Sequence, residues 1–328
     1  MGKNIRIYLT KSLLATISAA SLFMSSTSFC YAEELEIPDS HIDVAEIIFD
    51  DPDAPDILDG EAEQGESNVS TLIDEVSDEE ALIDAEAENG NLEVLSTITA
   101  TTPEEFYSDA LFIGDSIMVA FKNYSSRYKS SATHNAQFMA KNGLAAFYAL
   151  KGNEKPEKQP EFNGVRKAIW ENIDSPNIKK VFLSLGTNDL VGVSPERTSD
   201  NIITLVNNIK EVNPDIEIYI IGIAPVYAGT NKGYLSNQNI AIFNACLEEK
   251  ATALEIPFID IAKSLKTEGG DINPNYSSDG YVHQNRAAYD VWNQVLTEYA
   301  QNLIDQAQTI SEASSSPSQS DQCDLQAP

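Results

Sequence analysis

The sequence predicts an α/β fold in which a doubly wound, five-stranded parallel sheet lies between two layers of helices. Two observations lead to this prediction. Strand-length apolar runs alternate with helical apolar patterns over residues 102–305, and most of these runs are continuously apolar. Parallel strands that are covered on both faces have this composition. Right-handed crossovers through helices then produce a three-layer sandwich.

The expected elements follow one another in a regular order. Thr102 as cap and Pro103 in the first turn are a helix-start signature that opens the domain. Strands are expected at 110–113, 135–140, 180–185, 216–223 and 256–261, of which the run at 135–140 is the weakest. Helical patterns lie between and after them, at 116–128, 164–173, 196–212, 237–254 and 286–305.

The N-terminal residues 1–32 have the features of a secretory signal peptide. Lys3, Arg6 and Lys11 form a basic region, a short apolar stretch follows at 13–24, and cleavage is expected after Ala32. The apolar stretch is too short and too polar to span a membrane well. A membrane anchor, or a lipid anchor at Cys30, is the alternative. We expect a protein that is secreted or associated with the cell envelope, with no membrane-spanning segment after signal removal.

Charge separates an acidic linker from the folded domain. The formal net charge is −30, but residues 33–100 hold 23 Asp and Glu and no Lys or Arg. Residues 33–101 are therefore expected to be a disordered, self-repelling spacer, with a docking segment for a basic partner as the alternative. The Ser- and Gln-rich residues 306–328 are expected to be a disordered tail.

Several function classes are disfavoured by composition. Residues 101–328 remain acidic, so no basic surface is available for nucleic acid. The three cysteines lie in unrelated settings, and neither a CxxC nor an HExxH pattern occurs. We therefore expect no metal site and no cofactor. The oligomeric state does not follow from the sequence.

Polar residues collect where the expected strands end. Gly114-Asp115-Ser116 follows the first strand, Asn142-Gly143 the weak strand, and Gly186-Thr187-Asn188-Asp189 the strand at 180–185. Asp279 and His283 lie in a late loop just before the last helix. Parallel α/β sheets bind their ligands at the carboxyl ends of their strands. These residues are therefore expected to share one edge of the sheet.

The same residues carry a resemblance to a known family. The sequence resembles the SGNH hydrolases, also called GDSL esterases, whose GDS and GxND motifs are matched by 114–116 and 186–189. Gly143 matches the glycine of the family's middle block. Asp279 and His283 match its last block, Asp-x-x-His, with three intervening residues in place of two. The resemblance covers the domain at 102–305 and implies a flavodoxin-like sandwich and acyl-ester substrates.

Ester hydrolysis requires a nucleophile, a base and donors for the oxyanion. Ser116 begins a helix, so its hydroxyl can be exposed above the sheet and its N–H can serve as an oxyanion donor. The resemblance implies two more donors, the Gly143 amide and the Asn188 side chain. Asp115 and Asp189 are expected to be structural and to cap backbone amides.

Elimination selects the base. His41 lies in the acidic linker and His134 precedes the weak strand, so His283 is the histidine that is expected to reach Ser116. Asp279 would orient its imidazole. Because of the extra residue, a Ser–His dyad or a different acid remains an alternative.

The sequence thus predicts a secreted carboxylic-ester hydrolase that acts on short acyl esters, such as acetyl esters of carbohydrates or of other small molecules. The polar segment 151–163 offers no apolar lid for long-chain lipids. An acyltransferase on the same fold is one alternative. A non-catalytic cell-surface binding module, suggested by the altered Asp-x-x-x-His spacing, is the other.

Overall fold

The computed structural model describes residues 95, 97–173 and 176–315. The expected signal peptide, most of the acidic linker and the residues from 316 onward lie outside this part of the chain. Among the described residues, none of the helices combines the length and the apolar character that crossing a bilayer requires.

Five parallel strands form a central sheet in the order β2-β1-β5-β6-β7. The chain begins in an interior strand, goes to one edge and then returns to build the other half of the sheet. This order confirms the doubly wound arrangement, whose reversal lies between β1 and β5. The strands are β1 Ala110–Gly114, β2 Gln137–Ala140, β5 Lys180–Ser184, β6 Glu217–Ile221 and β7 Phe258–Ile259.

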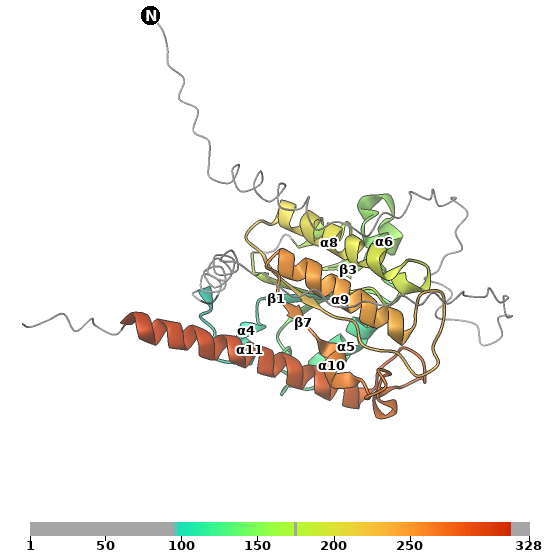
Figure 1. Cartoon of the computed structure of the whole chain (residues 1–328). Helices are drawn as coiled ribbons and strands as arrows, with labels where there is room; N and C mark the ends of the chain where they lie inside the picture. Colours follow the sequence, from blue (N-terminus) through green and yellow to red (C-terminus); the bar gives the residue numbers. More distant parts are fainter. Residues whose placement is uncertain (1–94, 96, 174–175, 316–328) are drawn as a thin grey trace, which may run out of the picture. The chain divides into compact units, whose positions relative to one another are not determined.

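Helices cover both faces of the sheet (Figure 1). One layer packs against Leu111, Val181 and Ile220, and the other packs against Phe112, Phe182 and Tyr219. Successive residues of each strand point to opposite faces, so a continuously apolar strand supplies both cores. The first layer contains α6 Ala146–Ala149, α7 Ile169–Asn172, α8 Pro195–Val212 and α9 Asn237–Ala253. The second contains α4 Pro103–Phe106, α5 Ser116–Arg127, α10 Ile261–Leu265 and α11 Arg286–Ser315.

An aromatic row crosses four neighbouring strands on the second face. Phe112 is in register with both Phe138 and Phe182, and Phe182 is in register with Tyr219. The rings stack with centroid separations of 5.2, 4.8 and 4.5 Å. Such cross-strand pairs stabilise a sheet. This row therefore helps to fix the register of the four strands, and with it the positions of their ends relative to one another.

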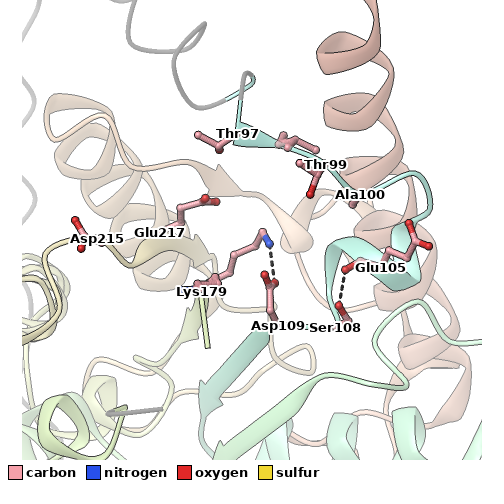
Figure 2. A pocket seen from close by; sticks show the side chains of 11 residues that line it. Thr97, Thr99, Ala100, Glu105, Ser108, Asp109, Lys179, Asp215 and Glu217 are labelled. Carbon is pink, nitrogen blue, oxygen red and sulfur yellow. Dashed lines mark hydrogen bonds and ion pairs between the residues drawn. The ribbon is translucent and has the colours of Figure 1, made fainter. Parts of the chain in front are cut away.

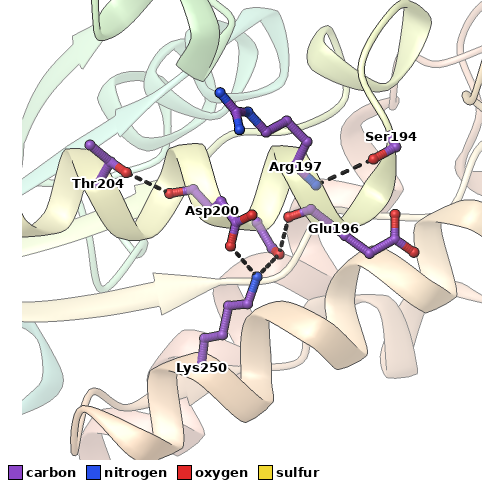
Figure 3. Close-up of polar contacts among 7 residues, drawn as sticks. Ser194, Glu196, Arg197, Asp200, Thr204 and Lys250 are labelled. Carbon is purple, nitrogen blue, oxygen red and sulfur yellow. Dashed lines mark hydrogen bonds and ion pairs between the residues drawn. The ribbon is translucent and has the colours of Figure 1, made fainter. Parts of the chain in front are cut away.

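A polar contact joins the two long helices of the first layer. Lys250 of α9 donates to the Ser199 hydroxyl of α8 at 2.7 Å and pairs with Asp200 at 2.5 Å (Figure 3). Ser194 caps the start of α8 by accepting from the Arg197 N–H. Ser199 is buried, whereas the Lys250–Asp200 ion pair is largely exposed, and an exposed ion pair contributes little to stability.

The expected helix at 164–173 is wrong for most of its length. Residues 161–166 form a hairpin of β3 Glu161–Phe162 and β4 Val165–Arg166, and helix α7 covers only Ile169–Asn172. Asn163 and Gly164, with φ of 52° and 77°, make the two-residue turn. Asn-Gly is the preferred pair for this turn, so the sequence carried a signal that the helical pattern obscured.

The last helix ends ten residues later than expected, at Ser315 instead of 305, so the tail expected to be disordered is helical over 306–315. Its last fully buried residue is Ile304. Beyond it, Gln and Ala are good helix formers, and the Thr309 hydroxyl donates to the Asp305 carbonyl oxygen at 2.9 Å. Intrahelical bonding therefore continues where tertiary packing stops.

Candidate active site

Ser116 lies at the junction between strand β1 and helix α5. Gly114 closes the strand, and a Cβ there would lie 2.6 Å from the Met118 Cβ and 2.8 Å from the Ser184 carbonyl oxygen. Asp115 caps the helix, because its Oδ1 accepts from the Ile117 N–H at 2.9 Å. Ser116 is the first helical residue and is partly exposed. Each residue of the GDS motif therefore has a separate local reason to be there.

His283 lies in the loop before α11 and reaches Ser116. Its Nε2 is 3.2 Å from the Ser116 Oγ, and its Nδ1 is 2.6 Å from Oδ2 of Asp279. The three side chains form one continuous hydrogen-bonded chain. About a third of the Asp279 and His283 side chains is exposed, so the chain opens to solvent.

The altered Asp-x-x-x-His spacing is absorbed within the loop. Oδ1 of Asp279 accepts from the Tyr281 N–H at 2.8 Å and from the His283 N–H at 3.1 Å. Gly280 turns the backbone with a φ of 69°, a conformation that is natural for glycine. One carboxylate oxygen thus closes the loop while the other remains available to the imidazole.

Asn188 connects the neighbours of the two other expected donors. Its Nδ2 donates to Oδ2 of Asp115 at 3.1 Å and to the Leu144 carbonyl oxygen at 3.2 Å. Leu144 follows Gly143, which has a φ of 69° in the loop after β2. The structure thus brings Asn188 and the Gly143 loop to the Ser116 end of β1. The sequence carried no signal that Asn188 would bind both Asp115 and Leu144.

Gly186 of the GxND motif is required on two counts. Its φ is 138°, and a Cβ there would lie 2.7 Å from the ring of Phe243 on α9. A side chain would strain the backbone and displace the aromatic ring. The tight turn delivers Asn188 and Asp189 directly after β5.

Asp189 caps backbone amides, which is the structural role expected for it. Its two oxygens accept from the Ala146 N–H at 2.8 Å and from the Phe147 N–H at 2.9 Å, at the start of α6. Burial raises its pKa to about 6, although these hydrogen bonds act in the opposite direction. Burial also raises the pKa of Asp115 to about 6, against the opposing effects of the Ile117 N–H and His283. Both groups are therefore buried carboxylates that are ionised only above mildly acidic pH.

Of the other two histidines, His134 lies away from this edge. The Nδ1 of His134 lies 2.8 Å from the Ser125 carbonyl oxygen in the last turns of α5, and His41 lies outside the described residues. Within the described part of the chain, no group of three or more His, Cys, Asp or Glu side chains is arranged to hold a metal ion.

A cavity of about 480 Å³ lies at the opposite end of the sheet (Figure 2). Glu105, Asp109, Asp215 and Glu217 line it together with Lys179 and Lys180. Asp109 and Lys180 form an ion pair of 2.6 Å. These residues lie at the amino ends of the strands, so the cavity is separated from Ser116 by the length of β1.

An α/β sheet that carries a serine, a histidine and an aspartate in one hydrogen-bonded chain at its carboxyl edge has the groups that serine-dependent hydrolases require. The profile of the GDSL-like Lipase/Acylhydrolase family matches residues 112–291. The chain belongs to this family, and at the level of the family it is an ester hydrolase of the lipase and acylhydrolase class.

Solved structures with a similar outline include a GDSL-like lipase from Bacteroides thetaiotaomicron and a carbohydrate acetylesterase family member from Sinorhizobium meliloti. The first is 18% identical, with 66% of this chain and 98% of that chain covered and a TM-score of 0.45. The second is 14% identical, with 60% and 99% covered and a TM-score of 0.41. At these values the likeness carries no conclusion about activity. No curated protein matches the chain.

Proposed function

We propose that the protein is an exported serine esterase that removes short acyl groups, such as acetyl, from carbohydrate or other small esters. Ser116 is the nucleophile, His283 the general base and Asp279 the group that orients the imidazole. The Ser116 N–H, the Gly143 N–H and the Asn188 side-chain amide are the oxyanion donors. The main support for this proposal is the chain of hydrogen bonds from Ser116 Oγ through His283 to Asp279.

The chemistry follows from the tautomer that Asp279 favours. With the proton on Nδ1, held by the carboxylate 2.6 Å away, Nε2 is unprotonated and can accept the Ser116 proton. The Ser116 oxygen then forms a bond to the ester carbonyl carbon, and the carbonyl oxygen becomes an oxyanion. Its collapse expels the alcohol, which takes the proton from His283, and leaves an acyl-Ser116.

Water completes the reaction by the same path. His283 accepts a proton from water, the resulting hydroxide adds to the acyl carbon, and Ser116 leaves with the proton from the imidazole. A sugar hydroxyl in place of water would make the protein an acyltransferase. Both outcomes use the same residues, and analysis of products formed in the presence of a sugar acceptor distinguishes them.

The polar segment 151–163 supports a short acyl group. Lys151, Asn153 and Glu154 are exposed in it, as are Pro156 and Glu157. An apolar lid that could cover a long acyl chain would bury such positions against lipid. The loop geometry at Asp279 supports the esterase over the alternative binding module, since the altered spacing still leaves the carboxylate within 2.6 Å of the imidazole.

Hydrolysis of p-nitrophenyl acetate tests the proposal. Ser116→Ala is expected to lower kcat by about 10³-fold or more, because the acyl-enzyme can no longer form. Ser126→Ala is the matched control, since Ser126 is an exposed serine in the last turn of the same helix, and it should retain the wild-type rate. Equal rates in wild type and Ser116→Ala would overturn the proposed function.

A further inference from the structure

Asp115 does more than cap a helix. Its Oδ1 accepts from the Ile117 N–H, whereas its Oδ2 accepts from the side-chain amide of Asn188, 73 residues away in the sequence. Both residues are buried, with exposed fractions of 3% and 6%. Capping alone uses one carboxylate oxygen, so the second contact requires a separate explanation.

The amide of Asn188 is held from two sides. One hydrogen points to the Asp115 carboxylate and the other to the Leu144 carbonyl oxygen. Asp115 precedes Ser116 in the chain, and Leu144 follows Gly143. The three groups assigned above as oxyanion donors are thus joined through their neighbours into one unit.

The two contacts differ in strength. A hydrogen bond to a carboxylate is charge-assisted and stronger than one to a neutral carbonyl oxygen. Burial raises the pKa of Asp115 to about 6, so the group is ionised in an esterase assay at pH 7.5. An oxyanion above Ser116 would therefore compete with the neutral Leu144 oxygen for an amide hydrogen, while the bond to Asp115 persists.

We propose that Asp115 is the positioning residue of the oxyanion site and acts by fixing the side-chain amide of Asn188 so that one hydrogen is presented to the oxyanion. This role rests on the proposed function of Ser116 and Asn188. It deepens that function, because it makes the residue before the nucleophile responsible for a donor that comes from a different strand. In this role Asp115 acts on the oxyanion only through Asn188.

A double-mutant cycle tests whether Asp115 acts through Asn188. Asp115→Asn keeps the size of the side chain but has one acceptor oxygen for two donors, so either the cap or the hold on Asn188 is lost. Asn188→Ala is expected to lower kcat for p-nitrophenyl acetate by about 10²–10³-fold. Asp115→Asn is expected to lower kcat by about 10–100-fold with KM nearly unchanged.

The combined variant decides the question. If Asp115 acts through Asn188, the double variant should be no slower than Asn188→Ala by more than about threefold. Multiplicative losses would mean that Asp115 acts independently and would overturn the proposal. If Asp115→Asn does not fold, Asp115→Ser takes its place in the cycle, since a serine can still cap α5.

A stability control and a direct readout complete the design. Ile304→Ala empties a buried position in α11 about 27 Å along the helix from its start and should lower the thermal midpoint without lowering kcat. The Asn188 side-chain amide signal in ¹⁵N NMR, assigned by its loss in Asn188→Ala, should exchange slowly in wild type and faster in Asp115→Asn. An unchanged exchange rate would contradict the proposal.

Failure of this role and failure of the proposed function are distinguishable. A rate that depends on Ser116 together with multiplicative losses in the cycle would overturn only the role of Asp115. A rate that does not depend on Ser116 would overturn both, whereas the NMR signal would still report whether Asp115 holds Asn188.

Discussion

The four-residue separation of Asp279 and His283 illustrates how a single side chain can organise a loop. Oδ1 of Asp279 accepts from two backbone amides, and Oδ2 accepts from the imidazole. The Ser277 hydroxyl accepts from the Gly280 N–H at 2.9 Å and supports the same turn. Loop closure and imidazole orientation thus depend on opposite oxygens of one carboxylate, so a substitution can separate them.

Asp279→Asn should make this separation. The Asn oxygen can still accept from the two loop amides, while its NH₂ faces Nδ1 of His283 and selects the tautomer with the proton on Nε2. That tautomer cannot accept the Ser116 proton, so kcat for p-nitrophenyl acetate at pH 7.5 should fall by about 10²–10⁴-fold with a nearly unchanged thermal midpoint.

Asp200→Asn is the control for this substitution, since Asp200 pairs with Lys250 at the surface between α8 and α9. Its kcat should stay within about twofold of wild type. A similarly small loss in Asp279→Asn would indicate a dyad in which the carboxylate is dispensable.

Buried carboxylates start two of the helices that border the site. Asp115 caps α5, and Asp189 binds the first amides of α6 from the turn after β5. Burial raises the pKa of both carboxyl groups from 3.8 to about 6. Between about pH 4 and 6 the folded protein therefore holds more protons than the unfolded chain, and the contribution of these groups to stability falls as pH rises through this window.

Asp189→Asn should remove the part of this pH dependence of stability that comes from Asp189. The variant cannot ionise at position 189 and has lost one amide acceptor, so it should be less stable than wild type. The difference in thermal midpoint between wild type and Asp189→Asn should be about 3–6 °C larger at pH 4.5 than at pH 7.5. The reason is that the wild-type protein no longer has to keep a buried carboxylate ionised at the lower pH. Asp115 and His283 also lie near this network, so differences between variants are more informative than the absolute curve.

Ser194→Ala provides the control for helix capping, since it removes a cap of α8 without removing a titratable group. The difference in thermal midpoint between Ser194→Ala and wild type should not vary with pH. If the difference in thermal midpoint between wild type and Asp189→Asn becomes smaller on acidification, the raised pKa of Asp189 is contradicted.

On the scale of the whole molecule, charge is distributed unevenly. Of the 51 Asp and Glu residues, 23 lie in 33–100, where no Lys or Arg occurs. The esterase site belongs to the part of the chain that follows.

The proposed export predicts where the mature chain begins. When the full sequence is expressed in a bacterium that can export it, the protein recovered outside the cytoplasm should begin at Glu33 by N-terminal sequencing. Leu14→Arg, which places a charge in the apolar stretch, should leave the precursor inside the cell. A recovered chain that begins at Met1 would indicate an uncleaved anchor, and a lipid-modified Cys30 a lipoprotein.

The sequence by itself determined the order of the central strands and the place of the proposed nucleophile in the chain. Continuous apolar runs, helix caps and turn residues are local signals, and they placed Ser116 after β1 and His283 in the loop before α11. Where two local signals competed, as at Asn163-Gly164, the helical pattern was misleading because the hairpin turn has the stronger geometric requirement. The length of α11 was missed because its last turns carry no apolar seam that would mark a helix.

The tertiary structure alone decided how these residues meet. The contact between Asp115 and Asn188 exists because β1 and β5 are neighbours in the sheet, and no local pattern specifies which strands pair. The reach of Asp279 across the longer loop likewise depends on backbone amides that fold back onto one carboxylate oxygen. Hydrogen bonds between distant residues are set by packing and register, and packing and register are properties of the whole chain rather than of any segment.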